Sequence, residues 1–167
     1  TNAKSLVMRR RQILTATAIG IGGLAGCAGG SNSGDSSGGG ASPTTSTVKT
    51  FYNTLYGNDD IEGANALYHP DSEAPALKPA DFEQWGGVES ISSTVASTET
   101  VEQSDGTTEV HAEVQYSVPM GTATETDWFV LSQADGEWRV ALWMPAAERR
   151  KLSDEEIAAA METAKSI

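Results

Sequence analysis

The side chains best suited to chemistry in this chain are a histidine at a predicted helix end and a carboxylate on a predicted strand. His69 comes just before Pro70, and a histidine exchanges protons near neutral pH, so it is a candidate general base. We favour a simpler role, in which its cationic form interacts with the negative end of the helix dipole. Asp127 lies between Thr126 and Trp128. If Trp128 packs outward, the carboxylate points into the domain, where it is the second candidate base. The simpler interpretation, which we favour, is an exposed aspartate.

A metal site is the other chemistry to consider. His111 alternates with Glu109 and Glu113 along one strand, and imidazole with carboxylates can bind a metal ion. Neighbours two apart on a polar strand face are usually solvated, so we predict no metal site and no cofactor. The sequence has no glycine-rich phosphate loop, no paired cysteines and no motif-supported Ser-His-Asp order. It therefore identifies no specific reaction.

The N-terminal segment indicates where the protein is located. An arginine cluster precedes a short, weakly apolar stretch over 13–25, in the order that a signal peptide requires. Arg10 and Arg11, followed by Gln12-Ile13-Leu14, resemble the twin-arginine export motif. The apolar stretch is shorter than the roughly 20 residues that a membrane-spanning helix needs. We therefore expect a signal peptide over 1–26, with Met8 as the natural start.

The end of this segment predicts a lipid anchor. Leu24, Ala25, Gly26 and Cys27 resemble a lipobox, and Cys27 is the chain's one cysteine. We expect Cys27 to be lipidated and to become the first residue of the mature protein. The protein would then lie on the outer face of the cytoplasmic membrane, attached through lipid. Residues 27–47, rich in Gly, Ser and Thr, are expected to form the anchor and a flexible linker.

The charge of the chain excludes one class of partner. Its formal net charge is −12, with 11 basic and 23 acidic residues. Removing residues 1–26 removes four basic and no acidic residues, which leaves 7 − 23 = −16. Nucleic acid is not expected as a partner, because its binding needs a basic surface. Scattered carboxylates with few lysines resemble proteins of extreme halophiles, in which salt screens the repulsion.

The remaining residues predict an α+β domain over 48–152 and a C-terminal amphipathic helix over 153–167. Helical spacing of apolar residues predicts a first helix over 48–56, capped by Ser46 or Thr47. A second helix is predicted over 61–68, with a cap at Asp59 or Asp60, and a short third one over 78–85. Ser153 and Glu156 form a capping box that starts the final helix.

Between the third and the final helix the period changes to that of strands. Strands are predicted over 88–103, 109–118, 123–132 and 138–143, with hairpins at Asp105-Gly106 and Asp135-Gly136. We expect N-terminal helices packed on a curved antiparallel sheet, followed by a C-terminal helix. In the last strand, Trp138 and Leu142 share one face, whereas Ala141 and Trp143 share the other. The pattern leaves open which face points inward.

This layout resembles the nuclear transport factor 2-like superfamily, whose curved sheet wraps around N-terminal helices to make a cone. The resemblance spans 48–143 and rests on the segments Phe51-Tyr52-Asn53-Thr54-Leu55-Tyr56, Ala66-Leu67-Tyr68-His69-Pro70 and Asp135-Gly136-Glu137-Trp138-Arg139-Val140. The superfamily implies a cone that holds either a ligand or a catalytic Asp, Glu or His. By residue type Asp81, Asp127 and His69 match that role. The fold does not decide between these functions.

Aromatic side chains are the candidate pocket lining of such a cone. They are Tyr52, Tyr56, Tyr68, Trp85, Tyr116 and Trp128, with Trp138 and Trp143 on the last strand. Each is more readily explained as a core residue, because aromatic side chains dominate core burial. Many aromatics without a catalytic constellation favour a non-enzymatic domain that binds a small apolar ligand or an envelope protein. The alternatives are a cone-type isomerase, dehydratase or cyclase, and an assembly role through the final helix. A homodimer is also conceivable from the resemblance.

Overall fold

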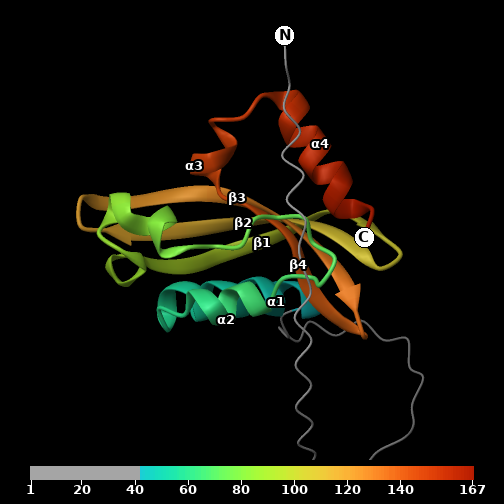
Figure 1. Ribbon diagram of the computed structural model, residues 1–167, viewed down its shortest axis with the longest axis horizontal. Coiled ribbons are helices and arrows are strands. Elements are labelled where there is room, and N and C mark those ends of the chain that lie inside the picture. Colours follow the sequence, from blue (N-terminus) through green and yellow to red (C-terminus); the bar gives the residue numbers. More distant parts are fainter. Residues whose placement is uncertain (1–41) are drawn as a thin grey trace, which may run out of the picture. The chain divides into compact units, whose positions relative to one another are not determined.

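The computed structural model describes residues 42–167 (Figure 1). The predictions for the signal peptide, for Arg10 and Arg11, and for the lipobox with Cys27 lie outside these residues. Within them, no helix is long and apolar enough to cross a membrane. The predicted fold class is confirmed: helices pack on a curved antiparallel sheet of four strands, and a further helix closes the chain.

The sheet is a meander in the order β1-β2-β3-β4, and all its pairs are antiparallel. The strands are β1 (Ser92–Ser104), β2 (Thr107–Val118), β3 (Gly121–Ala134) and β4 (Glu137–Met144). Both predicted hairpins are present. In the second hairpin, Asp135 and Gly136 have φ angles of 55° and 81°, as a two-residue turn with both central residues left-handed requires. The predicted first strand begins only at Ser92, because Val88–Ser90 form a short 3-10 helix.

The helices α1 (Pro43–Tyr52) and α2 (Ile61–Ala66) lie on one side of the sheet, which we call the inner face (Figure 1). The predicted cap at Ser46 or Thr47 is wrong, since Pro43 fits the first helical position and the Ser42 hydroxyl accepts a hydrogen bond from the Thr45 N–H. A π-helical turn, η1 (Asn53–Gly57), continues α1. Asp60 caps α2, as one of the two predicted alternatives had it.

The third predicted helix is a 3-10 helix, η2 (Pro79–Trp85), which ends at Gly86 with a φ of 89°. On the opposite, outer face lie the short α3 (Ala146–Arg149) and α4 (Asp154–Lys165). The predicted capping box of α4 is confirmed: the Ser153 hydroxyl accepts from the Glu156 N–H, and the Glu156 carboxylate accepts from the Ser153 N–H.

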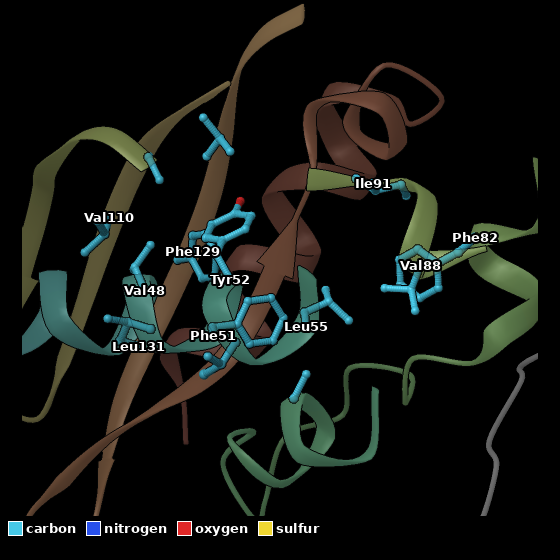
Figure 2. Close-up of a cluster of buried hydrophobic side chains, with 14 residues drawn as sticks. Val48, Phe51, Tyr52, Leu55, Phe82, Val88, Ile91, Val110, Phe129 and Leu131 are labelled. Carbon is cyan, nitrogen blue, oxygen red and sulfur yellow. The ribbon is translucent and has the colours of Figure 1, made fainter. Parts of the chain in front are cut away.

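The main core fills the space between the inner face and the helices (Figure 2). Its largest fully buried side chains come from α1, η1 and the three strands β2, β3 and β4: Val48, Phe51, Leu55, Val110, Val114, Phe129, Leu131 and Val140. A second, smaller cluster lies under α4 and contains Val130, Ala141, Met161 and Ala164. The sheet therefore separates a large aromatic core from a small aliphatic one.

A bulge in β4 settles the question of which face of the last strand points inward. Val130 pairs with Leu142 but Leu131 pairs with Val140, so Ala141 is an extra residue in β4. From Ala141 onward, the bulge reverses which face of the sheet each side chain of β4 points to. As a result Trp138, Val140 and Trp143 all pack against the main core, whereas Ala141 and Leu142 belong to the outer cluster. Strict alternation would have placed Trp143 and Val140 on opposite faces.

Candidate functional site

The chemical centre of the domain is Asp127, which is 0% exposed on the inner face of β3. The condition set by the sequence holds: Trp128 packs on the outer face, against the cluster under α4, and Asp127 points inward. Asp127 pairs with Ala112 of β2, which is itself a member of the main core. The interpretation of this residue as an exposed aspartate is thereby excluded.

Four donors converge on the Asp127 carboxylate. Oδ2 accepts hydrogen bonds from the Tyr52 hydroxyl at 2.6 Å and from the Tyr116 hydroxyl at 2.5 Å. The Trp143 indole N–H lies 3.3 Å from the same oxygen. Oδ1 accepts from the Ala146 backbone N–H at 2.9 Å. An ionised carboxylate has about two lone-pair positions on each oxygen, so three donors crowd Oδ2 whereas Oδ1 accepts a single hydrogen bond.

Each donor comes from a different element, so the carboxylate joins distant parts of the chain. Tyr52 ends α1, Tyr116 lies near the end of β2, Trp143 lies on β4 and Ala146 opens α3. Figure 2 shows Tyr52 projecting from α1 into the core beside Phe129. The buried charge is therefore surrounded by hydrogen bonds on all sides, which is the condition under which a buried carboxylate can be tolerated.

The tyrosine hydroxyls around Asp127 resist ionisation. Burial is the main cause that raises the pKa of Tyr52 and of Tyr116 well above the usual value, and the negative charge of Asp127 raises both further. Each hydroxyl has one hydrogen, and each donates it to Asp127. The two tyrosines therefore have no hydrogen left to donate to a ligand, and a substrate could reach Oδ2 of Asp127 only by displacing one of the donors that it already accepts from.

The other predicted pocket residues on the inner face are packed against each other. Tyr56 lies edge-on to Phe82 and to Tyr116, and Tyr68 lies edge-on to Phe51. Burial raises the pKa of both Tyr56 and Tyr68. Trp85, at the end of η2, also packs against the main core. These residues and Tyr52 form the wall of the aromatic core, as the simpler interpretation of them expected.

Trp128 does not belong to this group, which corrects its prediction as a pocket residue. Its ring stacks on the His111 imidazole, with centroids 4.7 Å apart, and the Arg149 guanidinium lies 4.1 Å from its ring centroid. His111 contacts Glu109 through Nε2 at 2.9 Å. The described residues hold no cluster of three or more side chains that could bind a metal ion.

His69 and Asp81 are not brought to Asp127. His69 is 6% exposed and lies beyond the end of α2. Its backbone N–H donates to the Val140 carbonyl, and its ring Nδ1 accepts from the Asp71 backbone N–H. Its ring nitrogen thus supports a turn. The Asp81 carboxylate accepts from the Lys78 N–H at the start of η2 and lies on the surface. Neither residue shares a hydrogen bond with Asp127 within residues 42–167.

The sequence contained a signal that places Asp127 on the same face of the sheet as Tyr116. Val118 pairs with Gly121, so a two-residue turn joins β2 to β3 and fixes the register. That register sets Asp127 of β3 opposite Ala112, on the face of the sheet that carries the apolar phase of β2 from Val110 to Val118, which includes Tyr116. The role of Trp143 had no such signal, because it depends on the bulge at Ala141.

A second feature is a surface groove of about 440 Å³ between α1 and the β3–β4 hairpin. On the helix side it is lined by Pro43, Ser46, Thr47 and Thr50, which share one face of α1. On the hairpin side it is lined by Gly136, Glu137, Trp138 and Arg139, and Leu67 also contributes to the lining. The Thr47 hydroxyl lies 3.5 Å from the Trp138 carbonyl oxygen, where the two walls meet.

No family model and no curated protein matches the sequence. Similar solved structures include an NTF-2-like protein of unknown function from Shewanella oneidensis MR-1, at 12% identity and a TM-score of 0.44, over 62% of this chain and 95% of that one. A cystatin-like-fold domain of unknown function from Nostoc punctiforme PCC 73102 has 15% identity and a TM-score of 0.41, over 72% and 94%. Aln2 from a Streptomyces species has 14% identity and a TM-score of 0.47, over 71% and 93%. At such identities the likeness concerns the fold alone.

Proposed function

We propose that this chain is an extracytoplasmic lipoprotein, anchored to the outer face of the cytoplasmic membrane through lipid on Cys27, whose folded domain binds a ligand or an envelope protein without catalysing a reaction. The proposal that the domain binds without catalysing a reaction rests on the burial and hydrogen bonding of Asp127. It is the one fully buried carboxylate of the described residues, and four hydrogen-bond donors engage it. A general base must come within hydrogen-bond distance of the proton that it removes, and the 0% exposed Asp127 is enclosed by these donors, which block that approach.

The proposal that the protein is anchored through lipid rests on the sequence. A twin-arginine segment, a short apolar stretch and a lipobox follow each other at the spacing that export and lipidation require. The acidic domain cannot be held at an anionic membrane by its own charge, since like charges repel. Lipid on Cys27 supplies the attachment in its place.

A cone-type enzyme is the second candidate, and one observation favours it. Asp127 faces the inner side, and the Tyr116 hydroxyl that contacts it belongs to a half-buried side chain. In an enzyme, a substrate would displace Tyr116 and take its place as hydrogen-bond partner of Asp127. The isomerase, dehydratase or cyclase reaction would then use Asp127 as its acid or base, with the tyrosines orienting it.

Two measurements test the proposal. Membrane fractionation of the Cys27→Ser variant checks the anchor: we expect the variant to leave the membrane, and an uncleaved variant that stays bound contradicts lipidation. Native mass spectrometry of the protein extracted from its own membrane checks binding. A bound small molecule or protein that dissociates unchanged supports a binding domain. A bound molecule that the wild type converts, and that an Asp127→Asn variant binds but leaves unconverted, would establish the enzyme instead.

A further inference from the structure

The groove beside α1 has one wall of hydroxyl groups. Pro43, Ser46, Thr47 and Thr50 recur at i, i+3, i+4 and i+7, so they lie along one face of the helix. The opposite face carries the buried Val48, Phe51 and Tyr52. Within residues 42–167, the side-chain hydroxyls of Ser46 and Thr50 have no hydrogen-bond partner in the protein, and both residues are exposed. Each hydroxyl can therefore both donate to and accept from a bound molecule.

The other wall carries a charge pair with unused capacity. The Arg139 Nη2 donates to Glu137 Oε2 at 2.6 Å, and Nη1 donates to the Ala66 carbonyl at 3.3 Å. A guanidinium has five N–H groups, so three remain. The second carboxylate oxygen of Glu137 has no partner among the described residues. The free carboxylate oxygen of Glu137 is thus a strong acceptor next to the free N–H donors of Arg139, and the charges of the two side chains cancel.

We propose that this groove binds a neutral carbohydrate, an inference that rests on the proposed binding function and names its ligand class. Two adjacent hydroxyls of a sugar ring each donate and accept, which suits the Glu137 oxygen beside the Arg139 N–H groups. The free hydroxyls of Ser46 and Thr50 offer the same duality on the opposite wall. Leu67 and Trp138 add apolar surface for the C–H groups of the ring. The volume of about 440 Å³ lies within the range of small-molecule sites.

Charge selects for a neutral ligand. The compensated pair gives the groove no net charge, and the chain from Cys27 onward carries −16, which disfavours anionic sugars. A cationic ligand would have to compete with Arg139 for Glu137. A neutral sugar can form hydrogen bonds with all the polar groups of the groove while Glu137 and Arg139 stay paired with each other. The groove lies outside the aromatic core, so its binding does not require the Asp127 hydrogen bonds to open.

The test is binding of maltose and cellobiose to the full-length lipoprotein, in a detergent without a sugar headgroup, by saturation-transfer NMR and calorimetry. Glucuronic acid is the charged comparison. We expect saturable binding of a neutral disaccharide, and an Arg139→Gln variant that binds about tenfold more weakly through the loss of charged donors. Thr50→Val should weaken binding by a smaller factor. Arg150→Gln is the matched control, because it removes the exposed Arg150–Glu125 pair outside the groove and should leave affinity unchanged.

Three results would overturn the inference. The first is that neither disaccharide, nor any immobilised neutral glycan, binds at tens of millimolar. The second is that glucuronic acid binds as tightly as the neutral disaccharides. The third is that Arg139→Gln and Thr50→Val leave the affinity for the disaccharide unaltered. If the native preparation nevertheless carries another small molecule or a protein, the binding function stands and only the carbohydrate assignment fails. If it carries a peptide in this groove, the occupant is a protein segment and not a sugar.

Discussion

At the scale of single residues, Asp127 is the side chain on which the inner layer depends most. A buried carboxylate without partners costs several kcal/mol, and its four hydrogen bonds offset that cost. The donors depend on it in turn, because Tyr52 and the Ala146 N–H are buried and have no alternative acceptor of equal strength. Removing the carboxylate would therefore leave unsatisfied groups from four elements at once.

An Asp127→Asn variant tests this interdependence. The amide keeps the shape but has only one acceptor oxygen. Its NH2 group must face either the two tyrosine hydroxyls or the Ala146 N–H, so at least one buried donor loses its acceptor. We expect the free energy of unfolding to fall by about 2–4 kcal/mol, measured by urea denaturation followed by tryptophan fluorescence. Asp71→Asn, on the surface, is the control. A loss no larger than that of the control would show that Asp127 does not hold the layer together.

The sequence pattern alone favoured an exposed Asp127, although it contained a signal for the inward position and for part of what the residue contacts. Its inward position follows from the two-residue turn between Val118 and Gly121, which sets the register of β2 against β3. The contact with Trp143 could not be predicted, since an extra residue in β4 decides it and nothing in the alternation of β4 marks Ala141 as a bulge. The partner N–H of Ala146 belongs to a turn whose path depends on packing.

At the scale of elements, local signals were reliable where they involve backbone chemistry. Asp135-Gly136 and the Ser153–Glu156 box predict a turn and a helix start that are both present. The start of α1 was missed because Ser42 and Pro43 stand in a run of Ser, Thr and Pro that resembles a linker by composition. Composition favours disorder there, whereas a cap followed by proline favours a helix, and the buried face that begins at Thr44 decides in favour of the helix.

The C-terminal helix should be sensitive to its cap. Only Met161 and Ala164 of α4 are buried, so tertiary packing contributes little and the capping box contributes proportionally more. Ser153→Ala should lower the free energy of unfolding by about 1 kcal/mol and raise the rate of amide hydrogen exchange along α4. Glu162→Gln, within the same helix and exposed, should change stability by less than about 0.5 kcal/mol. Equal exchange rates in both variants would contradict a role for the cap.

At the scale of the whole molecule, one sheet supports two unequal layers. The inner layer buries four aromatic rings almost completely, those of Phe51, Tyr52, Phe82 and Phe129, whereas the outer layer rests on small aliphatic contacts under α4. The chain is strongly acidic, so at low salt charge repulsion opposes the compact state. The cooperative unfolding of the domain should therefore be governed by the inner layer, which also contains every tyrosine of the chain.

That distribution makes alkaline unfolding a test of the entire inner layer. The chain has four tyrosines, and the pKa of each is raised, chiefly by burial. In the unfolded chain they ionise near a pH of about 10. Because the folded state keeps these protons and the unfolded state loses them, stability is unaffected below about pH 10. Above it, stability falls by up to about 1.4 kcal/mol per pH unit for each tyrosine.

Tyrosinate absorbance should consequently stay absent in the native protein and appear in one step with the loss of circular dichroism. In urea the same chain should titrate gradually near a pH of about 10. Tyr68→Phe is the informative variant, because the Tyr68 hydroxyl has no hydrogen bond within residues 42–167. The change removes one titrating group without breaking the Asp127 centre, so the decline of stability with pH should become less steep. Gradual ionisation near a pH of about 10 in a protein that keeps its native dichroism would mean that the inner layer admits solvent, and the cone would then be open to ligands.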